Sequence, residues 1–243
     1  MKRKGTMIHK EIESKYLLET LTVKIYRPEH FSKLYKYHLC IMQDGNDYYQ
    51  LGRIATFSDR LHSNKEIENT VFAGIHYKDR YDRREKYHPK GENQEAYMKF
   101  LRFEVVPLLD EEIPSYYMSG SRGLIGDSLG GTVSLMTALQ YPNTFGKVVM
   151  QSPYVNENVK NAVKQSEEIA AMTVYHTIGT DEKAVQTTSD GTKDFLTPNR
   201  ELRNLLMDRV DDYTYYELEG GNHTWKHWQK DMPRALVKTF GKK

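Results

Sequence analysis

Short apolar runs alternate along the chain with longer segments whose apolar residues recur every three or four positions. The short runs have the length of strands, and those with few charges are typical of strands covered on both faces of a sheet. They are residues 37–42, 70–75, 121–125, 147–150, 173–178 and 213–218. The helical spacing falls at residues 92–109, 132–141, 194–210 and 224–240. This alternation predicts a mostly parallel twisted sheet with helices on both faces.

The remaining segments refine this prediction. Residues 11–18 and 21–26 read as an antiparallel hairpin joined at Glu19 and Thr20. Pro107 is expected to end or kink its helix, and Pro233 to kink the last one. The segment 78–86 alternates in charge and is expected to be a loop with a solvated, ion-paired face, whereas 155–171 fits either a helix or a loop. No repeat or linker interrupts the pattern, so we expect one α/β domain over residues 1–243.

The composition narrows the class of partner and the compartment. The 35 basic and 33 acidic side chains give a net charge of +2, which argues against nucleic acid or an anionic membrane as the partner. The basic start is followed by no apolar signal region, and no run reaches membrane-spanning length, so we expect a cytoplasmic protein. Cys40 is the single cysteine, which excludes an intramolecular disulfide, and its apolar run predicts a buried thiol.

Ser128 is the candidate nucleophile. It lies in the segment 126–131, which reads GDSLGG, between a predicted strand and a predicted helix. A nucleophile elbow needs this context, because its strained turn admits only small residues two positions before and after the serine. The bare motif is weak, and the competing interpretation is a glycine-rich connection with a helix-capping serine. Agreement with the later partners favours the elbow.

A serine hydroxyl needs a base, and His223 is the candidate. It follows the last predicted strand in a glycine turn, Gly220-Gly221-Asn222, where its imidazole can reach the elbow and titrate in the useful range. His227, one helical turn later, is the rival, and a surface turn histidine is the alternative without function. His76 is placed near the same rim, and His176 reads as a structural histidine within a strand.

The imidazole needs a carboxylate, which in this architecture follows the strand after the elbow's βαβ unit. Asp181 and Glu182 are adjacent at that place, so the pattern leaves the acid ambiguous between them. Asp194 is a third candidate with a competing role as a helix cap. No metal-ligand spacing is present, and we expect no cofactor.

Two backbone amides are expected to bind the oxyanion. One is that of Leu129 at the start of the helix. The other belongs to the loop after the strand ending at Met42, where we choose Asn46 and then Gly45, against a simple β-turn. Trp225, Trp228, Tyr48 and Tyr49 read either as pocket lining or as core.

These motifs together resemble the putative esterase family of α/β-hydrolases, which includes enterochelin esterases, S-formylglutathione hydrolases, feruloyl esterases and antigen 85 mycolyltransferases. The resemblance covers about residues 21–240. It rests on segments 44–46 (DGN), 84–89 (REKYHP), 126–131 (GDSLGG) and 220–225 (GGNHTW), with Trp228.

The resemblance implies an α/β-hydrolase fold without a separate cap domain, with Ser128 and His223 as catalytic residues. It puts Glu182 ahead of Asp181 by spacing from Gly179, although aspartate is the more usual acid, and it points to the amides of Asn46 and Leu129. The expected function is a serine carboxylesterase working through an acyl-enzyme on a small-molecule ester. A thioesterase, a siderophore-trilactone hydrolase and a catalytically silent binding scaffold are the alternatives. Neither a nucleic acid nor a membrane is expected as a partner, and a homodimer is left open.

Overall fold

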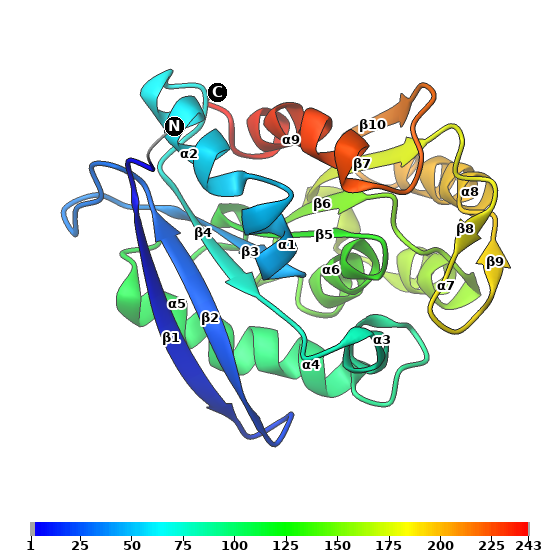
Figure 1. Ribbon diagram of the computed structural model, residues 1–243, viewed down its shortest axis with the longest axis horizontal. Helices are drawn as coiled ribbons and strands as arrows, with labels where there is room; N and C mark the ends of the chain where they lie inside the picture. The colour runs from blue at the N-terminus through cyan, green and yellow to red at the C-terminus, as the bar shows by residue number, and fades with distance from the viewer. Residues whose placement is uncertain (1–2, 243) are drawn as a thin grey trace.

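The computed structural model describes residues 3–242 and is built around an eight-stranded sheet (Figure 1). The strand order is β1-β2-β4-β3-β5-β6-β7-β10. The first two strands pair antiparallel, β2 also pairs antiparallel with β4, and every pair from β4 to β10 is parallel. The bounds are β1 Thr6–Ser14, β2 Glu19–Arg27, β3 His38–Met42, β4 Thr70–Ile75, β5 Arg122–Asp127, β6 Lys147–Gln151, β7 Thr173–Gly179 and β10 Asp212–Leu218. The predicted mostly parallel sheet is confirmed.

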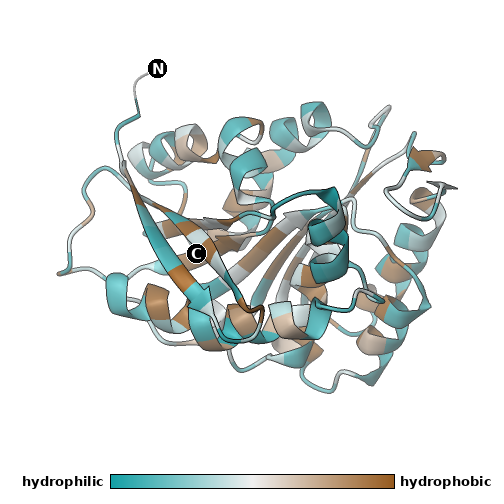
Figure 2. Ribbon diagram, turned by 60° about the horizontal axis from the view of Figure 1, so that its bottom comes forward, coloured by the Kyte–Doolittle hydropathy of each residue, from teal (hydrophilic) through white to brown (hydrophobic). Residues whose placement is uncertain are grey.

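Helices cover both faces of this sheet and enclose a separate apolar core on each. One face is covered by α1 (Gly45–Gln50), α2 (Ile54–Ser63) and α9 (Trp225–Phe240). The other is covered by α3 (Arg80–Tyr87), α4 (Gln94–Phe100), α5 (Val106–Glu112), α6 (Leu129–Gln140), α7 (Glu157–Gln165) and α8 (Leu196–Met207). Apolar colour runs through the central strands, while the outward sides of the helices are hydrophilic (Figure 2). Every residue of β4 and β5 is buried, as expected of strands sandwiched between helices.

The N-terminal hairpin is real, but its predicted turn is wrong. The chain turns at residues 15–18 instead of Glu19 and Thr20, so β2 begins at Glu19. The turn is held from outside the hairpin: Glu104 accepts hydrogen bonds from Ser14 Oγ at 2.6 Å and from the Lys15 amide at 2.8 Å. A local sequence pattern carries no sign of this distant carboxylate.

The predicted loop at 78–86 is also wrong, because residues 80–87 form α3. Asp79 caps this helix by accepting from the amides of Tyr81 and Asp82 at 2.8 and 3.0 Å. Its charged face is not uniformly solvated, since Lys86 is buried and ion-paired with Glu19 and Asp82. The capping signal was present in the sequence, but the dense charge obscured it.

Pro107 does not end its helix. The chain passes from α4 through one π-helical stretch, Leu101–Val105, into α5, which continues to Glu112. Proline has no N–H and its ring crowds the carbonyl four residues earlier, and a wider turn just before Pro107 accommodates both defects. Pro233 likewise lies inside α9, which spans its whole predicted length apart from the first residue.

Five further elements lie where the sequence pattern made no firm prediction. Helices α1 and α2 follow β3, and α1 begins inside what was expected to be a turn-rich loop. The open segment 155–171 contains α7. A small antiparallel hairpin, β8 (Val185–Gln186) and β9 (Thr192–Lys193), was missed altogether.

Candidate functional site

Ser128 stands at the junction of β5 and α6, as predicted, in a strained backbone conformation with φ 50° and ψ −124°. The turn is so tight that a Cβ on Gly126 would lie 2.1 Å from the carbonyl carbon of Gly130. The amide of Ser128 donates to the carbonyl of Gln151 on β6 at 2.9 Å. This is the geometry that the strand-to-helix elbow requires, and it holds the serine at the carboxyl edge of the parallel strands.

His223 and Glu182 are brought together at the same edge. His223 Nδ1 lies 2.6 Å from Glu182 Oε2, and Glu182 is buried. The other oxygen, Oε1, accepts from Ser152 Oγ at 2.6 Å and from the amide of Gly179 at 2.9 Å. Asp181 is exposed. Of the two adjacent acids, the carboxylate that contacts the histidine is therefore Glu182.

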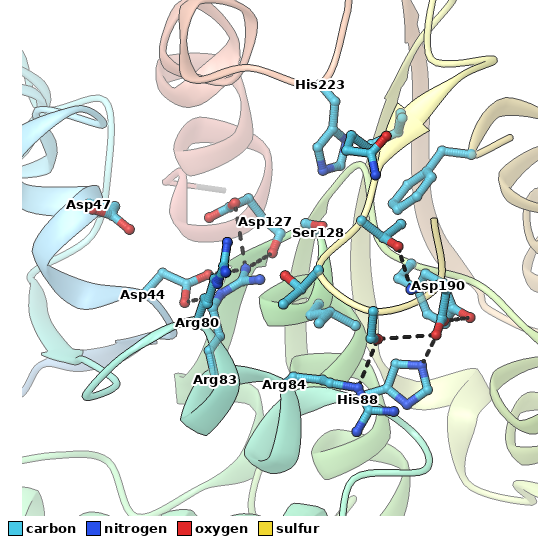
Figure 3. A pocket seen from close by; sticks show the side chains of 18 of the residues that line it. Asp44, Asp47, Arg80, Arg83, Arg84, His88, Asp127, Ser128, Asp190 and His223 are labelled. Atoms are coloured by element: carbon cyan, nitrogen blue, oxygen red, sulfur yellow. Dashed lines mark hydrogen bonds and ion pairs between the residues drawn. The ribbon is translucent and has the colours of Figure 1, made fainter. Parts of the chain in front are cut away.

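Ser128 and His223 border one cavity of about 320 Å³ (Figure 3). The imidazole packs edge-on against Phe195 and Trp228, with ring centroids 4.7 and 4.9 Å apart, which restricts its orientation. Trp225 and Trp228 border the cavity, whereas Tyr48 and Tyr49 are buried in the core.

The other histidines and the third acid lie elsewhere. His227 is half-buried on α9 and does not border this cavity. His76 borders a neighbouring cavity beside Lys24. His176 is buried between Asn199 Oδ1 and the hydroxyl of Tyr213, the structural role expected for it. Asp194 is exposed and accepts from the amide of Thr197 at 3.2 Å, at the start of α8.

The two predicted oxyanion residues differ in position. Leu129 borders the cavity and is the first residue of α6, so its N–H has no acceptor within the helix. Asn46, in the first turn of α1, borders the neighbouring cavity, where its Oδ1 accepts from Lys24 Nζ at 2.5 Å. Asp44, at the end of the loop after β3, and Asp47, on α1, border the cavity of Ser128 instead. The amides of Gly45 and Asn46 also lack helical acceptors because they begin α1.

Asp44 and Arg83 join the two loops that meet at Ser128. Arg83 Nε and Nη2 donate to the two oxygens of Asp44 at 2.8 and 2.7 Å, and Nη2 also donates to the carbonyl of Asp127 at 3.2 Å. Asp44 is buried and has a left-handed backbone, with φ 56°. One guanidinium from α3 therefore holds the loop after β3 and the elbow after β5 in fixed register.

Asp127, beside Ser128, is a buried acid that no hydrogen-bond donor fully satisfies. Its Oδ2 lies 3.9 Å from Arg83 Nη2, and its Oδ1 has no hydrogen-bond partner among the described residues. Burial raises the pKa of Asp127 well above its usual range, Asp44 raises it further, and Arg83 only partly opposes them. Burial therefore disfavours the ionised form of Asp127.

The far wall of the cavity is the turn of the β8–β9 hairpin, which is tied back to α3. Arg84 Nε donates to Ser189 Oγ at 2.8 Å, and Asp190 Oδ2 lies 3.5 Å from His88 Nε2 and accepts from the hydroxyl of Tyr154 at 3.0 Å (Figure 3). Burial lowers the pKa of His88, against the pull of Asp190, so its imidazole is neutral near pH 7.

Sequence reasoning missed several residues of this site. Ser152 contacts the predicted acid Glu182, Arg83 joins the two loops beside Ser128 through Asp44 and the Asp127 carbonyl, and the hairpin turn was not anticipated. One signal was available: Ser152 follows β6, and polar residues just beyond the carboxyl ends of parallel strands gather at one edge of the sheet. Within residues 3–242, no cluster of three or more metal-ligating side chains occurs, and no helix is long and apolar enough to span a bilayer.

Known proteins resemble this chain in sequence and in fold. The family model described as Putative esterase matches residues 14–239. A Bacillus subtilis (strain 168) protein described as Uncharacterized protein YjcH is 48% identical over 236 residues, which cover 97% of this chain and 98% of that protein.

Two solved structures share the fold at low identity. The enterobactin esterase FES from Shigella flexneri superposes with a TM-score of 0.80 at 16% identity over 96% of this chain, which spans 58% of the length of that esterase. A ferulic acid esterase superposes with a TM-score of 0.81 at 15% identity, covering 98% of both chains.

Proposed function

Because the chain belongs to the Putative esterase family, we propose that it is a serine carboxylesterase with Ser128 as nucleophile, His223 as base and Glu182 as the acid. The family supports an esterase activity, and the mechanism and residues are our proposal. The single observation that carries it is the contact of 2.6 Å between His223 Nδ1 and the buried carboxylate of Glu182, beside a strained serine in the same cavity.

In this mechanism Ser128 Oγ attacks the ester carbonyl carbon while His223 Nε2 accepts the hydroxyl proton. Glu182 fixes the imidazole with Nδ1 protonated and stabilises the imidazolium that forms. The oxyanion of the tetrahedral intermediate is bound by the amide of Leu129 and by an amide from the first turn of α1, where Asn46 is our choice. His223 returns the proton to the departing alcohol, leaving an acyl-serine. A water molecule, activated by the same histidine, then releases the acid.

Two substrate alternatives use the same machinery. A thioester or a siderophore trilactone presents the same carbonyl carbon to Ser128, and the likeness to an enterobactin esterase makes the trilactone a reasonable substrate to include. A panel containing p-nitrophenyl esters of increasing chain length, an acyl thioester and a catecholate trilactone ranks these classes by kcat/KM.

The decisive experiment is labelling by a fluorophosphonate probe. The wild-type protein should react once, and mass spectrometry of the digested adduct should place the label on Ser128. Ser128→Ala should abolish both labelling and hydrolysis, with a melting temperature close to that of the wild type. A scaffold used only for binding would not be labelled, and retention of more than a few per cent of activity in Ser128→Ala would reject the assignment.

A further inference from the structure

Three arginines line one wall of the cavity above Ser128. Arg80, Arg83 and Arg84 lie on α3 at spacings of three and four residues, so they share one face of that helix, and all three border the cavity (Figure 3). Like charges at this spacing repel one another. Opposite charges, from the protein or from a bound ligand, offset this repulsion when they lie against the same face.

Only one of the three is paired with a carboxylate that borders the cavity. Arg83 donates from Nε and from Nη2 to the two carboxylate oxygens of Asp44. Arg84 pairs with Glu85, which does not border the cavity, and donates from Nε to the uncharged Ser189 hydroxyl. Within residues 3–242, Arg80 forms no ion pair; its Nη2 donates to the hydroxyl of Tyr81 at 2.8 Å.

Among the described residues, the other acids of the cavity form no ion pair with Arg80 or Arg84. Asp127 Oδ2 lies 3.9 Å from Arg83 Nη2 and forms no ion pair with Arg80 or Arg84. Asp190 accepts from the hydroxyl of Tyr154 and lies beside His88; against the effect of burial, the Tyr154 hydrogen bond and the nearby Arg84 lower its pKa, but Arg84 makes no ion pair with it. Asp47, which lies on α1, accepts from the hydroxyl of Tyr77 at 3.3 Å. The cavity therefore has two guanidinium groups that no carboxylate within it binds.

We propose that the substrate is a small ester that carries an anionic group, a carboxylate or a phosphate, bound by Arg80 and Arg84 while the ester carbonyl lies at Ser128. This inference rests on the proposed function. Guanidinium groups bind both anions through paired hydrogen bonds, and the hydroxyl of Thr188, which borders the same cavity, offers a further donor. A volume of about 320 Å³ is at the lower end of small-molecule sites, which favours a compact substrate over a long acyl chain.

The test compares anionic esters with neutral esters of similar size. For an anionic acyl group, the pair is the mono-p-nitrophenyl ester of adipic acid and p-nitrophenyl hexanoate. For an anionic leaving group, 4-acetoxybenzoate and 4-acetoxyphenyl phosphate are each compared with methyl 4-acetoxybenzoate. In at least one pair, kcat/KM should favour the anionic member by about 10- to 100-fold. The preference should shrink as salt is raised.

Variants connect the preference to the two arginines. The ratio of kcat/KM for the anionic and neutral members should fall towards one in Arg80→Gln and Arg84→Gln, and Arg80→Lys should retain part of it. Taking the ratio within each variant cancels any general loss of activity. Lys78→Gln is the matched control, because it removes a nearby charge that borders a different cavity, and its ratio should equal that of the wild type.

The outcomes separate the two proposals. Equal hydrolysis of charged and neutral members, or a preference that survives in the double variant Arg80→Gln/Arg84→Gln, overturns the anionic substrate and leaves the esterase standing. If no ester is hydrolysed and the fluorophosphonate probe does not label Ser128, the esterase proposal and the inference both fail.

Discussion

Glu182 divides its two carboxylate oxygens between His223 and Ser152, at 2.6 Å from each. Ser152 is fixed in turn by the indole of Trp228, whose Nε1 donates to its hydroxyl at 2.9 Å. The carboxylate therefore cannot rotate without losing a buried hydrogen bond. This arrangement fixes the orientation of the imidazole, as the proposed mechanism requires for proton transfer, and it can be tested residue by residue.

Replacing the acid should separate Glu182 from its neighbour. In Glu182→Gln the amide cannot stabilise the imidazolium, so we expect turnover to fall by about 100- to 10,000-fold. Asp181→Asn is the matched control, since that side chain is exposed, and it should change turnover little. Steady-state kinetics on one p-nitrophenyl ester measures both. The opposite pattern would assign the acid to Asp181, and equal mild effects would point to Asp194 or to a serine–histidine dyad.

Arg83 should affect catalysis through position and not through substrate charge. Arg83→Lys keeps the charge but cannot make the two parallel hydrogen bonds to Asp44, so the loop after β3 should lose its register with the elbow. We expect kcat to fall by about 10- to 100-fold with a smaller change in KM. The affinity of a trifluoromethyl ketone, which mimics the tetrahedral intermediate, should fall by the same factor as kcat/KM.

One outcome would contradict a positioning role for Arg83 in catalysis. If Arg83→Lys leaves kcat/KM and ketone binding unchanged while lowering only the melting temperature, Arg83 is structural. Asp44→Asn, which removes the charge from the other side of the same pair, should reproduce the catalytic loss.

The pH dependence of turnover should report His223. Only the neutral imidazole can accept the proton of Ser128, so kcat should rise with pH through a single ionisation and reach a plateau. His223→Ala should remove both the activity and the ionisation, whereas His227→Ala should leave the profile unchanged because His227 does not border the cavity. A profile lost in His227→Ala instead would show that the wrong histidine was chosen.

Stability should also depend on pH, for a reason remote from the site. Burial lowers the pKa of His176 to about 4, with the hydrogen bond that His176 Nε2 donates to Asn199 Oδ1 opposing it. Because the folded value lies below the unfolded value of about 6.5, the unfolded state binds more protons between them. The contribution of neutral His176 is therefore complete above pH 6.5 and is lost as the pH falls towards 4, by about 3 kcal/mol in total.

Denaturant unfolding at pH values from 7 to 4.5 measures this dependence. His176→Gln, which stays neutral, should be less stable at pH 7 but should lose less stability on acidification than the wild type. Parallel curves for the two proteins would show that other groups, such as the paired carboxylates, cause the acid sensitivity.

Local chemistry determined the parts of this protein that the sequence predicted. The glycines around Ser128, the apolar runs of β3 to β7 and the turn before His223 each constrain a few neighbouring residues. A strained turn admits only small residues wherever it occurs, and a strand covered on both faces must be apolar. The fold class and the candidate nucleophile and base followed from these short patterns. The choice of Glu182 over Asp181 came from resemblance and spacing alone.

Only the tertiary structure decided which side chains share a space. Glu104 sets the turn of the first hairpin, Arg83 joins two loops through Asp44, and Ser152 holds Glu182, yet these partners lie 30 to 90 positions apart in the chain. Adjacent residues such as Asp181 and Glu182 point to solvent and core respectively because of the backbone after β7, which composition does not specify. Periodicity encodes which face of an element is buried, whereas the contacts made on that face depend on how the elements pack.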